Sequence, residues 1–241
     1  MAVSHSSCWR KLTSPGAGAS PLALLAGGLL LAFGAAAEDG GEGRILDRLA
    51  AVVNGHPLTQ SQVELEAHIA LIQRGGVAGA DAVLDAQALR PALDYAIAQR
   101  MAGDEADKLH TAPIEENEAQ AALKAFKQRL GGEKPFGLWL AREETDLPQV
   151  LAILTRGLQA DRLYEKKVGL RAQVGEADVR RFWDAHPELH QQSYESQRQA
   201  LKDRLDRERF QQLVAEEIAQ SRRTADIRLI APWARDGEAT P

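Results

Sequence analysis

Residues 44–67 (RILDRLAAVVNGHPLTQSQVELEA) constrain the fold more than any other part of the sequence. Two β-branched valines precede Asn54-Gly55, the pair preferred in a tight type I′ hairpin turn. Pro57 follows in the return strand, and proline has no backbone N–H to donate to a neighbouring strand. The sequence therefore predicts a two-stranded hairpin in which Pro57 lies either in an edge strand or at the start of the return strand.

The predicted hairpin leads directly into a capped helix. The hydroxyl of Thr59 can accept a hydrogen bond from the first helical turn, and Gln62, three residues later, completes a capping box. Apolar residues then continue at helical spacing to about Gln73, where the pair Gly75-Gly76 ends the pattern.

A short strand is predicted near the other end of the chain. Residues 225–230 (ADIRLI) alternate between polar and apolar side chains, which is typical of a half-buried strand. A single strand needs a partner, and the hairpin is the only other strand that the sequence predicts. We therefore expect Ile227 and Leu229 to lie beside the strand 49–53, so that one small antiparallel sheet joins the two ends of the domain.

Most of the intervening sequence has the three- and four-residue apolar spacing of amphipathic helices. Pro91 is expected to fit only in a first helical turn, which places the start of the second helix near Leu89 or Arg90. Pro113 is expected to open the next helix, and Asp146 to cap a later one. The expected helices cover residues 89–109, 113–130, 136–140, 147–168, 176–186 and 193–223. The predicted fold class is mostly α, a multi-helix domain with a small antiparallel sheet.

The last predicted helix changes its apolar side along its length. Tyr194, Leu201 and Leu205 lie near one azimuth, whereas the apolar residues between 210 and 218 lie roughly opposite. Such a helix is expected to pack against different partners in its two halves.

Residues 1–37 have the features of a secretion signal. Arg10 and Lys11 supply the positive charge, residues 22–33 supply an apolar segment, and two alanines at 35 and 37 form a cleavage site. The apolar segment is shorter than the roughly 20 residues of a membrane-spanning helix, and an uncleaved anchor is the alternative. Residues 38–43 form an acidic, glycine-rich leader that is predicted to be disordered.

Composition excludes several classes of function. Cys8 is the single cysteine and precedes the apolar segment, whereas a lipoprotein cysteine would follow it. The mature chain thus has no disulfide scaffold and no cysteine-based metal or redox site. The formal net charge of −5 favours neither nucleic acid nor anionic membrane surfaces as partners.

No catalytic, metal or cofactor motif stands out in the sequence. His186 and His190 flank Pro187-Glu188-Leu189, but a metalloprotease motif needs glutamate directly after the first histidine on a continuous helix. Pro187 occupies that position and breaks the helix. Neither a nucleophile elbow nor a phosphate-binding loop is present. We therefore predict no enzymatic activity and no cofactor.

Aromatic residues are the remaining candidates for a binding site. Core packing is the favoured interpretation of each ring taken singly. The alternative is an apolar groove for extended peptides, for which a short and loosely tethered helix with a partly exposed Phe136 and Trp139 is best suited. The candidate client-binding residues are Phe126, Phe136, Trp139 and Leu140.

Four motifs, taken in order, are similar to the SurA N-terminal domain family of periplasmic chaperones. They are residues 47–59 (DRLAAVVNGHPLT), 93–106 (beginning LDYAIAQRM and ending EA), 174–179 (VGEADV, followed by Phe182 and Pro187) and 222–230 (RRTADIRLI). The resemblance implies a helical chaperone core over residues 44–231, followed by a tail at 232–241. It also implies an ATP-independent protein of the periplasm that holds unfolded envelope or outer-membrane proteins through apolar contacts.

The sequence departs from the larger family members at one junction. Those members carry parvulin prolyl isomerase domains between the His-Pro-Glu helix and the long C-terminal helix, but here only residues 189–192 separate the two. A parvulin domain of roughly a hundred residues has no room there. The expected partners are unfolded or extended polypeptides, with no nucleic acid and no stable membrane insertion after signal cleavage. A dedicated envelope assembly subunit is the alternative, and prolyl isomerase is disfavoured.

Overall fold

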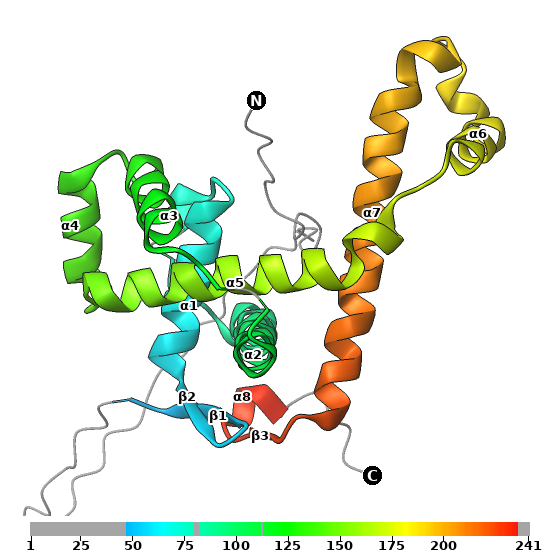
Figure 1. Ribbon diagram of the computed structural model, residues 1–241. Coiled ribbons are helices and arrows are strands. Elements are labelled where there is room, and N and C mark those ends of the chain that lie inside the picture. Colours follow the sequence, from blue (N-terminus) through cyan, green and yellow to red (C-terminus); the bar gives the residue numbers. More distant parts are fainter. Residues whose placement is uncertain (1–46, 80–81, 112, 236–241) are drawn as a thin grey trace, which may run out of the picture. The chain divides into compact units, whose positions relative to one another are not determined.

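The computed structural model of the protein describes residues 47–79, 82–111 and 113–235 (Figure 1). The predicted signal, the leader and residues 44–46 lie outside the described residues. Within the described part, the protein is mostly helical and contains a three-stranded antiparallel sheet. The predicted fold class is therefore confirmed.

The hairpin consists of β1 (Leu49–Val53) and β2 (His56–Thr59). Asn54 and Gly55 connect the strands with φ angles of 49° and 83°, the left-handed values that a type I′ turn requires. The strand order is β2-β1-β3, so Pro57 lies in an edge strand, as predicted.

The third strand, β3 (Ile227–Leu229), pairs antiparallel with the free side of β1. Leu229 lies opposite Ala51, and Ile227 lies opposite Val53. This register confirms that strands from the two ends of the domain join in one sheet. The sheet packs on α2 (Ala86–Leu109) through a shared cluster of buried side chains.

Asn54 connects the hairpin turn to two other segments. Its side-chain amide donates to Asp104 Oδ2 on α2 at 2.6 Å, and its Oδ1 accepts from the backbone N–H of Asp226 at 3.2 Å. The backbone N–H of Asn54 also donates to the Asp226 carbonyl at 2.8 Å. The turn thus fixes the approach of β3 as well as that of β2.

Replacing Asn54 by glycine is expected to lower the free energy of unfolding by about 1–2 kcal/mol. Glycine adopts the left-handed turn conformation freely, so the variant loses the two side-chain hydrogen bonds but not the backbone geometry. Urea denaturation measures the effect, and His56→Ala, at an exposed position of the same hairpin, is the control. Equal stability of the Asn54→Gly variant and the wild type would show that these hydrogen bonds contribute nothing.

The first helix, α1 (Gln60–Gln73), begins and ends where the sequence predicts. The Thr59 side chain accepts from the backbone N–H of Gln62, and the Gln62 side chain accepts from the backbone N–H of Thr59 at 3.2 Å. The predicted capping box is therefore confirmed.

The start of α2 corrects the sequence prediction. The helix begins at Ala86, three residues before Leu89, because the Asp85 carboxylate accepts from the backbone N–H of Ala88 at 2.8 Å and caps it. Pro91 consequently lies inside the helix, where its ring removes one backbone hydrogen bond. The cap and the burial of Leu89 outweigh that loss.

The next helix, α3 (Glu116–Arg129), also begins at a different residue from the predicted one. Pro113 precedes the helix instead of opening it. The side chain of Glu118 accepts from the backbone N–H of Glu115 at 3.0 Å, and this reciprocal cap sets the helix start. Two acidic residues in the first turn add favourable interactions with the helix dipole.

The remaining elements are η1 (Val77–Gly79), α4 (Glu133–Arg142), α5 (Leu147–Ala172), α6 (Glu176–Ala185), η2 (Pro187–Leu189), α7 (Tyr194–Thr224) and α8 (Pro232–Arg235). Among them, α4 to α7 follow the predicted order, whereas the short helices η1, η2 and α8 were not predicted. Asp146 caps α5 by accepting from the backbone N–H of Gln149, as predicted. Residues 232–235, assigned above to a tail, form α8 instead, because the apolar Ala234 is buried against the sheet core.

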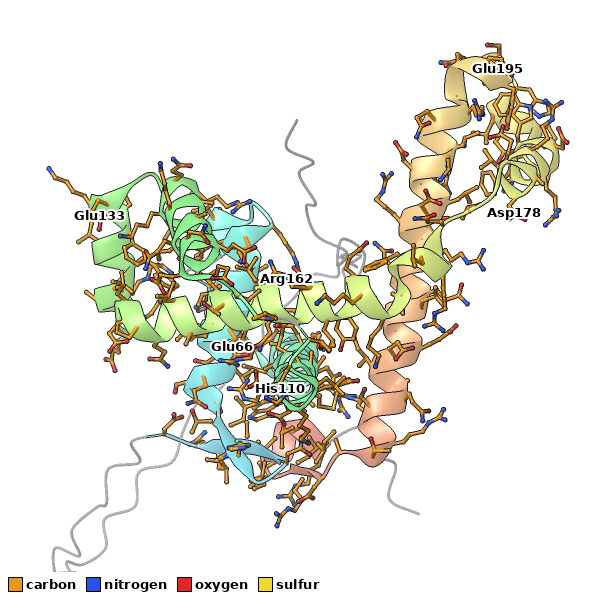
Figure 2. The ribbon with its side chains drawn as sticks, in the orientation of Figure 1. Glu66, His110, Glu133, Arg162, Asp178 and Glu195 are labelled. Carbon is orange, nitrogen blue, oxygen red and sulfur yellow. The ribbon has the colours of Figure 1, made fainter. Side chains whose placement is uncertain are left out.

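The long helix α7 takes part in two separate hydrophobic clusters. Near its start, Leu201 is buried with Val179 and Trp183 of α6, and Figure 2 shows this helical hairpin with Asp178 and Glu195 labelled on its two helices. Further along, Val214 is buried in a second cluster with side chains of α2 and α5. The predicted change of apolar side is confirmed.

Candidate functional site

The predicted client-binding aromatics are part of the core. Phe126 of α3 is 0% exposed, and Phe136 and Trp139 of α4 are each 2% exposed. The Phe126 ring centroid lies 5.3 Å from that of Trp139 and 6.2 Å from that of Phe136. Leu140 is partly buried against the same cluster.

The expectation that Phe136 and Trp139 are partly exposed is therefore wrong. The two residues are three positions apart on α4, so both rings project from one side of the helix toward the cluster formed with α3 and α5. Leu138, between them in the sequence, faces solvent with 75% of its surface exposed. None of the four predicted client-binding residues lines the groove described next.

An open groove lies instead between α2 and α5, with a volume of about 560 Å³. We call it the α2–α5 groove. The α2 wall consists of Arg100, Gly103, Asp104 and Asp107.

The α5 wall changes character along the helix. It begins with three apolar residues near the start of α5, Pro148, Leu151 and Ala152, and continues with the polar residues Thr155, Arg156 and Gln159. A hydrogen bond crosses directly from one wall to the other, where the Gln159 amide donates to Asp107 Oδ1 at 2.6 Å.

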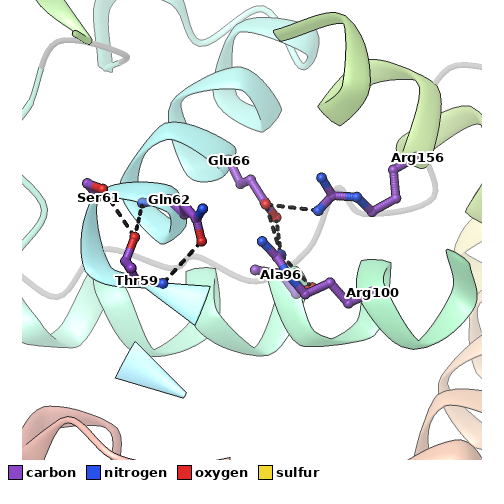
Figure 3. A network of polar contacts seen from close by, with 7 residues as sticks. All are labelled: Thr59, Ser61, Gln62, Glu66, Ala96, Arg100 and Arg156. Atoms are coloured by element: carbon purple, nitrogen blue, oxygen red, sulfur yellow. Dashed lines mark hydrogen bonds and ion pairs between the residues drawn. The ribbon is translucent and has the colours of Figure 1, made fainter. Parts of the chain in front are cut away.

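A buried carboxylate holds the two arginines of the groove (Figure 3). Glu66 of α1 is 3% exposed, and its Oε1 lies 2.8 Å from Arg100 Nη1 and 3.0 Å from Arg156 Nη1. Burial lowers the pKa of Arg100, and the Glu66 carboxylate opposes that decrease. An arginine side chain stays protonated in proteins. The Glu66 carboxylate therefore forms ion pairs with both arginines and ties α1 to both walls of the groove.

The groove also contains two acids without a cationic partner. Asp104 and Asp107 are three positions apart on α2, and each accepts a hydrogen bond from a side-chain amide, Asn54 or Gln159. Neither forms an ion pair within the part of the chain that the structure describes. Asp104 nevertheless lies close enough to Arg100 to favour its charged form. Asp107 therefore gives the groove exposed negative charge, whereas Asp104 is half-buried.

The histidines of the sequence motif form no metal site. His186 Nδ1 lies 2.7 Å from the Phe182 carbonyl, and His190 Nε2 lies 3.0 Å from the Trp183 carbonyl. Both rings are thus engaged with the backbone of α6. Among residues 47–79, 82–111 and 113–235, no group of three or more potential ligands could hold a metal ion.

Sequence reasoning missed the α2–α5 groove. Glu66, Asp104 and Asp107 have the spacing of ordinary solvated helix faces, and no motif marks them. One weak signal is Gly103, which weakens a helix interior and is used where another element approaches closely. A Cβ at Gly103 would lie 3.6 Å from Arg156 Cγ, in ordinary van der Waals contact across the groove.

Comparison of the sequence with models of known protein families finds no match, and comparison with curated proteins finds none either. The resemblance to the SurA N-terminal domain therefore rests on the four sequence motifs and stays a prediction. Within the described ranges, no helix is both long and apolar enough to cross a membrane.

Proposed function

We propose that this protein is a periplasmic chaperone-like protein that holds unfolded envelope or outer-membrane proteins reversibly and without ATP. The observation that carries the proposal is the open α2–α5 groove, which is lined by apolar side chains as well as by charged hydrogen-bonding groups. An extended polypeptide presents both kinds of surface, because its backbone groups are unpaired and its side chains alternate in direction.

Each part of the groove has a role in this proposal. Leu151 and Ala152 supply the apolar contact that a partly unfolded protein seeks. Arg156 supplies donors for backbone carbonyls, and Asp107 supplies acceptors for backbone N–H groups. Because the groove is open to solvent, a chain can enter and leave it without a covalent or nucleotide-driven step.

The cellular setting and the family come from the sequence. The predicted signal supports export, and the four motifs support a SurA-like chaperone core that lacks a parvulin domain. In the structure, η2 and a short turn connect α6 to α7. The proposal is therefore that of a binding protein and not of a prolyl isomerase.

An aggregation assay tests the proposed function. Purified protein at a stoichiometric ratio is expected to suppress the light scattering of an unfolded outer-membrane protein diluted from urea. Ala152→Trp, at an exposed position in the groove, is expected to weaken suppression by filling the groove. Ala121→Trp, at an exposed position of α3 outside the groove, is the control for an added surface tryptophan.

The outcomes separate the alternatives. No suppression by the wild type would refute the chaperone proposal. If the Ala152→Trp variant suppresses aggregation as well as the wild type does, client binding lies elsewhere on the protein. A pull-down that returns one stable partner, in place of many unfolded proteins, would indicate a dedicated assembly subunit.

A further inference from the structure

We propose that the α2–α5 groove selects polypeptide segments in which a lysine or arginine stands directly beside an apolar residue. This inference rests on the proposed function, because it specifies which segments the groove holds. It follows from the charges of one wall, the apolar surface of the other and the geometry of an extended chain.

The accessible charge on the α2 wall is negative. Asp107 is exposed and Asp104 is half-buried, and no cation pairs with either of them among the described residues. Arg100 and Arg156 are less accessible, since their side chains are 15% and 25% exposed and share the buried Glu66 carboxylate. A chain that enters the groove from solvent therefore meets the exposed carboxylate of Asp107 more readily than the half-buried arginines.

The opposite wall begins with apolar surface. Pro148, Leu151 and Ala152 line the groove near the start of α5. Successive side chains of an extended polypeptide point in opposite directions. Asp107 faces Gln159 across the groove, and Ala152 lies about two helical turns before Gln159 on α5. A chain that passes between these two regions would direct one residue toward the acids of α2 and its sequence neighbour toward the apolar part of α5.

Charge complementarity decides which neighbours fit. A lysine or arginine facing Asp104 and Asp107 gains two attractive interactions, whereas an acidic residue there meets repulsion. A segment with a basic residue next to a leucine thus matches both walls at once. A neutral apolar segment matches only the α5 wall, and an acidic segment matches neither wall well.

The test uses a variant that removes charge and keeps hydrogen-bonding capacity. In Asp104→Asn/Asp107→Asn, each new amide oxygen can still accept from the side chain that donates to the original carboxylate. Asp203→Asn is a matched control, because Asp203 is an exposed acid on α7 that accepts from the Gln199 amide at 2.7 Å outside the groove.

Two labelled peptides serve as probes, with the centres Leu-Lys-Leu and Leu-Gln-Leu between identical serine-rich flanks. Fluorescence anisotropy with the full chain is expected to show about five- to tenfold tighter binding of the lysine peptide, the range expected for two partly exposed charge pairs. The double variant is expected to bind both peptides equally, and Asp203→Asn to keep the preference. Raising the salt concentration should reduce the preference of the wild type.

Each outcome has a separate meaning. If neither peptide binds the wild type, polypeptide binding by the groove fails, and the proposed function loses its support. If both peptides bind with equal affinity, the selectivity proposal is refuted while polypeptide binding stands. If Asp203→Asn abolishes the preference as fully as the double variant does, the preference comes from overall charge, and the assignment to the groove is refuted.

Discussion

Replacing Glu66 by glutamine should lower the free energy of unfolding by about 2–4 kcal/mol. The substitution removes the negative charge that Arg100 and Arg156 share and leaves two partly buried guanidinium groups beside each other. Because both arginines retain some contact with water, the expected loss is below that of a fully buried ion pair. The effect should be visible as a lower midpoint in urea denaturation.

The matched control for this prediction is Glu64→Gln on the same helix. Glu64 accepts from the Gln60 amide at 2.8 Å and forms no ion pair within the described residues, so its substitution should change stability by less than about 0.5 kcal/mol. Equal stability of the Glu66→Gln protein and the wild type would mean that the arginines are held by their helices and not by the shared carboxylate. The groove walls would then be independent of α1.

Replacing Phe126 by alanine should cost about 3–5 kcal/mol of stability. The side chain is fully buried and contacts both aromatic rings of α4, so its removal leaves a cavity between α3 and α4. Part of the loss comes from edge-to-face ring contacts, which add to the burial of apolar surface. Denaturation monitored by circular dichroism measures the change.

Leu138→Ala provides the contrast on the other side of α4. Because Leu138 is 75% exposed, its truncation should change stability by no more than about 0.5 kcal/mol. A Phe126→Ala protein with nearly wild-type stability and weakened polypeptide binding would contradict the assignment of this ring to the core. It would favour the interpretation of the aromatics as a binding surface.

Local signals in the sequence were sufficient to predict much of the fold. Asn54-Gly55, the capping box of Thr59 and the cap at Asp146 each act within a few residues, so they can be recognised without tertiary information. The pairing of β3 with β1 joins segments that are far apart in the sequence. It could still be predicted, because the sequence predicts few strands and therefore few possible partners for β3. Errors arose where proline and a capping acid competed, as at Pro91 and Pro113, and there the cap set the helix start.

The candidate site could not be predicted in the same way. Glu66 lies on a helix where charged residues normally face water, and its burial depends on two arginines that other helices bring to it. The groove exists because α2 and α5 meet along only part of their lengths, and helical periodicity does not specify that geometry. The exposure of Trp139 likewise depends on where α3 and α5 pack against α4. The sequence of α4 alone does not determine that packing.

The pairing of β1 with β3 has a consequence for when the chain can fold. The sheet joins β1 to a strand that lies much later in the sequence, so the hairpin lacks its third strand until β3 has been synthesised. A lone hairpin is marginally stable in water, and pairing between distant segments is slow to form. The sheet is therefore completed only after residue 229 has emerged. Such a delay would be compatible with the proposed export, in which the chain crosses a membrane before it folds.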